Sequence, residues 1–303
     1  MQTIVFGNVT LDIICYPVDE VPRHDSLSFD KAIVSPGGCA SNTAIGLASL
    51  GVPTGLVAHT GNGDAASLLQ DYWERLGVNT RFVQAVPGVT TGISVGLVDS
   101  DLSPRFVHTS GANATLTADD LDVQALMETD IEHLHIAGFF VLPGLLDEVI
   151  VRKLAALREE EISISLDVVF NERMDDPDLR AVLWQMMPNL DYFLCNDFEA
   201  FRLTGIDDPI QAAQNLKGRG AGNVIVKLGE KGSWLEADSG GEPIPAPQVE
   251  VVDTTGAGDA FAAGFVAALV RGDDVASACR AGNQAGARIC TKLGAIEAWL
   301  QGQ

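Results

Sequence analysis

The chain has 303 residues, of which 47% are hydrophobic and 20% are charged, and its formal net charge at pH 7 is −22. This length suits one large or two smaller domains, and the composition is that of an ordered globular protein. The charge argues against nucleic acid and anionic membrane surfaces as partners, because both would repel the chain at long range. A small anionic ligand in a locally positive pocket stays compatible with it.

Cysteine usage and apolar runs predict a cytoplasmic protein. The cysteines are odd in number, far apart and without CxxC spacing, which favours a reducing compartment. They are Cys15, Cys39, Cys195, Cys279 and Cys290. The first residues lack the basic segment of a signal peptide, and Asp12 interrupts their apolar run. No apolar run reaches the roughly 18 residues that a membrane span needs.

Short apolar runs alternate with longer segments of helical composition along the chain. The predicted strands cover 3–9, 55–60, 133–139, 163–169, 192–196 and 223–229. The predicted helices cover 41–50, 65–76, 145–159, 177–187, 209–217, 259–271 and 274–291. Strands rich in Val, Ile and Leu that are separated by helices are typical of βαβ units. The pattern therefore predicts a mostly parallel central sheet with helices on both faces and right-handed crossovers.

Two regions depart from this alternation. Residues 11–36 contain three prolines and no helical period, and residues 91–110 alternate around a turn predicted at 99–104. Both are expected to form strands outside the main sheet, as a small lid. Because no repeat or linker divides the chain, we expect a single domain, 1–303, that carries this β-strand lid.

Three sequence patterns are candidates for a phosphate site. The Walker pattern GxxxxGK[ST] is excluded, because the chain contains no Gly-Lys pair. A GxGxxA pattern occurs at Gly61, Gly63 and Ala66, but the acidic residue that a dinucleotide site needs about 20 positions later is missing from 79–88. With 31 glycines in the chain, such a match is weak evidence.

The third pattern is DTTGAGDAFAAGF, residues 253–265. Small residues at a helix start leave N–H groups free to bind an anion, with the positive end of the helix dipole behind them. Gly256, Ala257 and Gly258 would thus form a hole for a phosphoryl group during its transfer. Asp259 lies close enough to accept a proton from an attacking hydroxyl. The alternative is that Asp259 is an ordinary N-cap and the glycines form a turn.

The string 253–265 as a whole resembles the C-terminal signature of the ribokinase-like carbohydrate kinases, the phosphofructokinase-B family. Four further segments resemble that family's motifs in the family's order and extend the resemblance over nearly the whole chain. They are GNVTLD (7–12), PGGCASNTAIGLASLG (36–51), CNDFEAFRLTG (195–205) and VKLGEKGSW (226–234). The resemblance implies a ribokinase-like three-layer α/β sandwich.

The resemblance also implies roles for residues around the phosphoryl group. Asp259 would be the general base, and the N–H groups of residues 256–258 would stabilise the transferred phosphoryl. Asn196 and Glu199 would position Mg²⁺ and the phosphates of ATP, mostly through water, as suits a hard oxygen ligand. The alternative is that these two residues cap a helix and form its first turn.

Four further residues are implied on the nucleotide side. Lys227, Gly229 and Gly232 would lie along the phosphates and the ribose, with Lys227 as a point charge. Asn283 would line the adenine pocket. A monovalent cation such as K⁺ would lie beside Asp253 and the carbonyl group of Thr255.

On the acceptor side, Asp12, Gly37, Gly38 and Asn42 would hold sugar hydroxyls, because an aspartate and an asparagine together offer acceptors and donors. The alternative is that the two glycines form a turn before the next helix. Arg105 of the lid could meet a carboxylate or phosphate on the sugar, as in relatives that act on 2-keto-3-deoxygluconate. Its alternative is a solvated arginine in a flap.

We therefore expect an ATP- and Mg²⁺-dependent phosphotransferase that acts on a hydroxymethyl group of a small sugar or sugar acid. One alternative is a nucleoside kinase with an aromatic slot for the base from Phe139, Phe140, Phe106 or Tyr16. Phe139 and Phe140 also stand where ribokinase itself uses an acidic sugar contact, which argues against ribose. Another alternative is a non-catalytic sugar-binding protein. A homodimer through the exposed edge of the lid is also expected by analogy.

Overall fold

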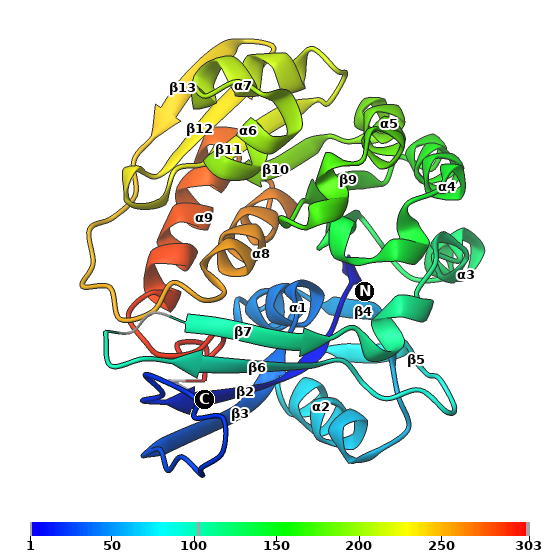
Figure 1. Cartoon of the computed structure of the whole chain (residues 1–303). Helices are drawn as coiled ribbons and strands as arrows, with labels where there is room; N and C mark the ends of the chain where they lie inside the picture. The colour runs from blue at the N-terminus through cyan, green and yellow to red at the C-terminus, as the bar shows by residue number, and fades with distance from the viewer. Residues whose placement is uncertain (1, 102–103, 301–303) are drawn as a thin grey trace.

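A computed structural model of the chain describes residues 2–101 and 104–300. Its main sheet has the strand order β13-β12-β11-β10-β9-β8-β1-β4-β5 (Figure 1). The pairs from β5 to β11 are parallel, and β12 and β13 are antiparallel. The bounds are β1 Thr3–Gly7, β4 Thr54–Thr60, β5 Asn79–Ala85, β8 His133–Ala137, β9 Ser163–Asp167, β10 Tyr192–Asn196, β11 Asn223–Lys227, β12 Ser233–Ala237 and β13 Gly240–Ile244.

Helices cover both faces of this sheet, as the alternation along the sequence predicted. One face carries α3 to α7 over a core that includes Phe6 and Ile136; the other carries α1, α2, α8 and α9 over a core that includes Val5 and Ile225. Successive strand residues point to opposite faces, so strands such as β1 and β11 supply both cores. The helices are α1 Cys39–Ser49, α2 Asp64–Arg75, α3 Val123–Met127, α4 Glu148–Glu159, α5 Pro177–Met186, α6 Asp197–Thr204, α7 Pro209–Lys217, α8 Ala257–Val270 and α9 Val275–Ile289.

The predicted lid segments form a second sheet with the order β3-β2-β6-β7, which lies beside α1 and α2 in Figure 1. Its strands are β2 Thr10–Tyr16, β3 Lys31–Gly37, β6 Ile93–Val98 and β7 Pro104–Thr109. This confirms extra strands outside the main sheet. Part of the turn predicted at 99–104, residues 102–103, lies outside the described residues.

Three strands of the main sheet were not predicted. Strand β5 lies at the sheet edge and is largely exposed, so it lacks the apolar signal of a buried strand. Strands β12 and β13 form the opposite edge as an antiparallel hairpin. Helix α4 begins at Glu148 rather than at 145, because the side chain of Asp147 caps it by accepting from the N–H of Val149 at 2.8 Å.

In the part of the chain that the structure describes, no helix has both the length and the apolar character needed to cross a membrane. The parallel strands bring their carboxyl ends to one edge of the sheet, which is the usual position of a ligand site in such folds. Asp167, Asn196 and Lys227 are the last residues of β9, β10 and β11. Side chains far apart in the sequence therefore gather there.

Candidate active site

Helix α8 begins at a bend that requires glycine. Gly256 is the N-cap, with a φ of 77°, and a Cβ on it would lie 2.7 Å from the Cβ of Ala295. Asp259 is the third residue of the helix, so the alternative that it is the N-cap is wrong. Within residues 2–101 and 104–300, no acceptor meets the N–H groups of Gly256 and Gly258.

The predicted anion hole needs one correction. The N–H of Ala257 already donates to the carbonyl oxygen of Thr254 at 3.1 Å. This bond closes the tight turn that leads into α8. Of the three N–H groups predicted to form the anion hole, only those on either side of Ala257 are therefore without an acceptor among the described residues.

Asp259 lies half-buried at this helix start and contacts α1. Its Oδ2 accepts a hydrogen bond from Nδ2 of Asn42 at 2.8 Å. Burial raises the pKa of Asp259 to about 7, while the Asn42 hydrogen bond acts in the opposite direction. A carboxylate with this pKa is suited to accept a proton near neutral pH.

The residues predicted to hold sugar hydroxyls lie together where β2, β3 and α1 meet. The carboxylate of Asp12 is so close to Gly37 that a Cβ there would lie 2.0 Å from Cγ of Asp12. Gly38 has a φ of 84° and is the N-cap of α1. Asn42 follows in the first turns of α1, and its buried Oδ1 has no partner among the described residues. That oxygen is available to a hydroxyl donor, and Asn42 thus links the residues predicted to hold the sugar to Asp259.

Arg105 is not part of this group. Asp12 pairs with Ser94, and Ser94 pairs with His108, so His108 shares the face of Asp12 on the lid sheet. Arg105, three residues from His108, points to the opposite face. Its Nη2 donates to the carbonyl oxygens of Val18 and Asp19 at 2.6 and 3.0 Å. The predicted substrate contact of Arg105 is therefore corrected to a contact within the lid.

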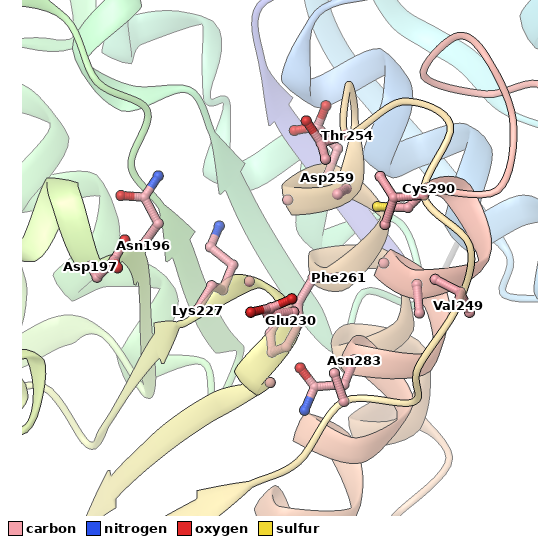
Figure 2. A pocket seen from close by; sticks show the side chains of 18 of the residues that line it. Asn196, Asp197, Lys227, Glu230, Val249, Thr254, Asp259, Phe261, Asn283 and Cys290 are labelled. Atoms are coloured by element: carbon pink, nitrogen blue, oxygen red, sulfur yellow. The ribbon is translucent and has the colours of Figure 1, made fainter. Parts of the chain in front are cut away.

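The nucleotide-side residues line a cavity of about 690 Å³. Its lining includes Lys227, Gly229, Gly232, Gly258, Asp259 and Asn283. Figure 2 shows Lys227 reaching from the end of β11 towards the start of α8, which forms the opposite wall with Asp259. The structure thus brings the predicted base and the predicted phosphate contacts to one cavity.

Asn283 and Gly232 line the cavity and also contact the β12–β13 hairpin. Nδ2 of Asn283 donates to the carbonyl oxygen of Ile244 at 3.0 Å and to Oγ of Ser233 at 3.2 Å, which ties α9 to the β12–β13 hairpin. Gly232 has a φ of 93°, and a Cβ there would lie 2.1 Å from the carbonyl oxygen of Ile244. Both residues therefore shape the wall by contacts within the protein.

Asn196 and Glu199 form a capping box at the start of α6. The side chain of Asn196 accepts from the N–H of Glu199 at 2.8 Å, and Glu199 accepts from the N–H groups of Asn196 and Phe170 at 2.7 and 3.1 Å. Their alternative role as helix cap and first turn is confirmed. Burial raises the pKa of Glu199 to about 7, against the lowering effect of Lys227.

These contacts limit how the two residues could hold Mg²⁺. Both carboxylate oxygens of Glu199 are engaged by backbone N–H groups, which fits a metal held through water better than direct ligation. No group of three His, Cys, Asp or Glu side chains that could hold a metal occurs among the described residues. The donor set therefore suits Mg²⁺ that keeps its own waters and the oxygens of its nucleotide.

The carboxylate of Asp253 holds the loop before α8. Its Oδ1 accepts from the N–H and the hydroxyl of Thr255 at 2.9 and 2.8 Å, and its Oδ2 accepts from the N–H of Gly294 at 2.8 Å. The carboxylate thus joins the loop to the segment after α9. The monovalent cation predicted beside Asp253 and Thr255 stays a prediction.

Asp167 was not among the predicted site residues. Both of its carboxylate oxygens lie 2.7 Å from Nζ of Lys227, and it lines the same cavity. The signal that could have indicated it is an aspartate at the end of SISLD, an apolar strand predicted to be buried in the parallel sheet. Because Lys227 is 60 residues away, only the strand order reveals the pair.

The aromatic slot predicted for a nucleoside loses two of its four members. Phe139 and Phe140 are fully buried, and they pack in the core beneath α4. Because both rings belong to this core and are fully buried, neither presents surface to a ligand. Phe106 is 40% exposed on the lid, and Tyr16 is half-buried.

Comparisons with known proteins cover nearly the whole chain. Residues 2–301 match the family model described as pfkB family carbohydrate kinase. An uncharacterized sugar kinase of Archaeoglobus fulgidus is 30% identical over 254 residues, 84% of this chain and 97% of that protein. A deoxyribokinase of Salmonella typhi is 29% identical over 92% of this chain and 89% of its own length.

The solved structures agree with this picture. The structure of an Arabidopsis thaliana ribokinase complexed with ribose and ATP superimposes with a TM-score of 0.82. The two chains are 25% identical, and the match covers 98% of this chain and 95% of the other. The predicted ribokinase-like three-layer fold is thereby confirmed.

Proposed function

The chain belongs to the pfkB family of carbohydrate kinases, and on that premise we propose that it transfers the γ-phosphoryl group of ATP to a hydroxymethyl group of a small sugar. One observation carries the proposal: Asp259 and Gly258 line one cavity, and among the described residues no acceptor binds the N–H of Gly258. The proton acceptor would then act on the attacking hydroxyl, and the anion site would bind the phosphoryl group that it attacks. The names of the sugar kinase and deoxyribokinase relatives support a sugar as acceptor.

The chemistry follows from these positions. Asp259 takes the proton of the acceptor hydroxyl while the hydroxyl oxygen forms a bond to the γ-phosphorus. The bond between the γ-phosphorus and the β–γ bridging oxygen breaks. ADP carries the released electron pair, and the phosphorylated sugar is the second product. The N–H groups of Gly256 and Gly258, at the positive end of α8, stabilise the charge on the transferred group. Asn42 orients Asp259 and offers its Oδ1 to another hydroxyl.

On the nucleotide side, Lys227 would contact the phosphates while residues 229, 232 and 283 border the rest of the nucleotide. Mg²⁺ bound with ATP would neutralise charge on the phosphate oxygens. Asn196 and Glu199 would hold its waters. A K⁺ ion at Asp253 and Thr255 and a dimer through the lid edge are further parts of this proposal.

The lid would complete the acceptor site. Asp12 presents its buried carboxylate from β2, and Gly37 and Gly38 allow the backbone to approach a sugar ring. Closure of the lid sheet over the sugar would exclude water that otherwise hydrolyses ATP. Since Arg105 points to the other face, the geometry favours neutral sugars over sugar acids.

The test is ADP release with ATP, Mg²⁺ and a panel of neutral sugars, sugar acids and nucleosides. We expect release with at least one neutral sugar and not with nucleosides. ADP release with nucleosides alone would show that the acceptor is a nucleoside and not a sugar. Phe106 is the most exposed of the four aromatic residues predicted to bind a nucleobase. Sugar binding without ADP release would identify a non-catalytic binding protein.

A further inference from the structure

Asp167 and Lys227 form an ion pair at the carboxyl edge of the parallel sheet. Strand β10 lies between β9 and β11, so the lysine side chain crosses β10 to reach the aspartate. Nζ lies 2.7 Å from both Oδ1 and Oδ2 of Asp167. The side chains are 15% and 7% exposed, so water screens the pair little.

The pair leaves one donor of the ammonium group unused. A lysine ammonium has three N–H donors. At most two of them bind the oxygens of Asp167, and among the described residues no other acceptor binds Nζ. The ion pair therefore holds Nζ in place and leaves at least one N–H for another acceptor.

The unused donor lies beside the start of α8. A Cβ built on Gly258 would have Nζ of Lys227, at 3.4 Å, as its nearest neighbour. Both residues line the cavity that also contains Asp259. A phosphate group received by the N–H of Gly258 would therefore also lie next to the ammonium group.

We propose that Asp167 is a positioning residue for phosphoryl transfer, which holds Lys227 with its third N–H directed at the phosphate next to Gly258. This inference rests on the proposed function. Asp167 itself does not touch the nucleotide in this arrangement. Its carboxylate fixes a flexible side chain and compensates its buried charge.

The central variant is Asp167→Asn, which keeps the shape of the side chain. It removes the negative charge and one of the two oxygens that Nζ of Lys227 contacts. We expect the turnover number to fall on the order of 10- to 100-fold, because small displacements of a positioned group have effects of this size. The KM of the sugar should stay unchanged, since the pair is on the nucleotide side. The matched control is Asp238→Asn, which breaks the Lys217–Asp238 pair, where Asp238 is 91% exposed, and should leave turnover unchanged.

A double variant separates positioning from a purely structural role. Lys227→Met should lower turnover at least as much as Asp167→Asn, and combining the two should add less than about twofold, because Asp167 acts through Lys227. Removing both charges should also restore part of the thermal stability that Asp167→Asn alone loses. Losses that multiply in the double variant, or a folded Asp167→Asn protein with wild-type turnover, would overturn the proposal.

Calorimetric titration keeps this test separate from the proposed function. If the wild-type chain binds ATP but phosphorylates no acceptor, the proposed function fails. Both single variants should still bind ATP about tenfold more weakly than the wild type, with ADP affinity unchanged, because ADP lacks the terminal phosphate. Equal loss of affinity for ADP and ATP would contradict the position assigned to Lys227.

Discussion

Asn42 and Asp259 lie 217 residues apart in the sequence, yet Nδ2 of the asparagine donates to Oδ2 of the aspartate at 2.8 Å. This bond joins the first turns of α1 and α8, which carry residues predicted to bind the sugar and the phosphate group. The other amide atom of Asn42, Oδ1, is buried and free within the described part of the chain. In the proposed function, this one side chain would orient the base and bind the acceptor.

Replacing Asp259 by Asn should lower turnover by about 10²- to 10⁴-fold, because the general base is lost while the shape is kept. Binding of ATP should change little. The measurement is ADP release under saturating ATP and acceptor. Asp64→Asn, at an exposed acidic residue in the first turn of α2, is the control and should behave as wild type. Near-normal turnover in the Asp259 variant would reject it as the base.

Activity should depend on pH through the same carboxylate. Burial raises the pKa of Asp259 to about 7, and the base works only when it is deprotonated. Below this pKa the protonated form dominates, so kcat/KM should fall about tenfold for each pH unit from roughly pH 6 downwards, and level off above roughly pH 8. A profile that is flat between pH 5 and 8 would show that Asp259 does not control the rate.

Asn42→Ala should shift this profile and weaken acceptor binding. Without the Nδ2 donor, the charged form of Asp259 loses a hydrogen bond that lowers its pKa, so the acid limb should move to higher pH. The KM of the sugar should rise because Oδ1 is lost as well. Asn215→Ala on the exposed face of α7 is the matched control. An acid limb at the wild-type pH would show that Asn42 does not influence the pKa of Asp259.

Two glycines of the anion hole should respond differently to alanine. Gly256→Ala should lower the unfolding temperature, because its φ of 77° and the 2.7 Å approach to Ala295 leave no room for a Cβ. Gly258→Ala should keep the fold, since its Cβ would meet only Nζ of Lys227 at 3.4 Å, but should weaken ATP binding and turnover.

Calorimetric unfolding and ADP release together test this contrast. Gly218→Ala, where φ is −61°, provides a control for both. A Gly258→Ala protein that binds and turns over ATP normally would mean that no phosphate lies at this position. A Gly256→Ala protein with unchanged stability would contradict the strain at the N-cap.

Local features were within reach of the sequence alone. The alternation of apolar runs and helices predicted the parallel sheet with two helical layers, because strands buried on both faces are mostly apolar. The glycines before Asp259 and the capping pair Asn196 and Glu199 depend on spacings of a few residues. Short-range geometry of this kind follows from backbone stereochemistry and local hydrogen bonds.

Relations across the sheets were decided only by the tertiary structure. The Asp167–Lys227 pair depends on strand order, and the direction of Arg105 depends on the register of β2, β6 and β7. The aromatic rings of Phe139 and Phe140 would suit a slot for a nucleobase, but both side chains are buried in the core. Side chains separated by tens or hundreds of residues meet only through the packing of whole elements, and no local pattern encodes which ones face each other.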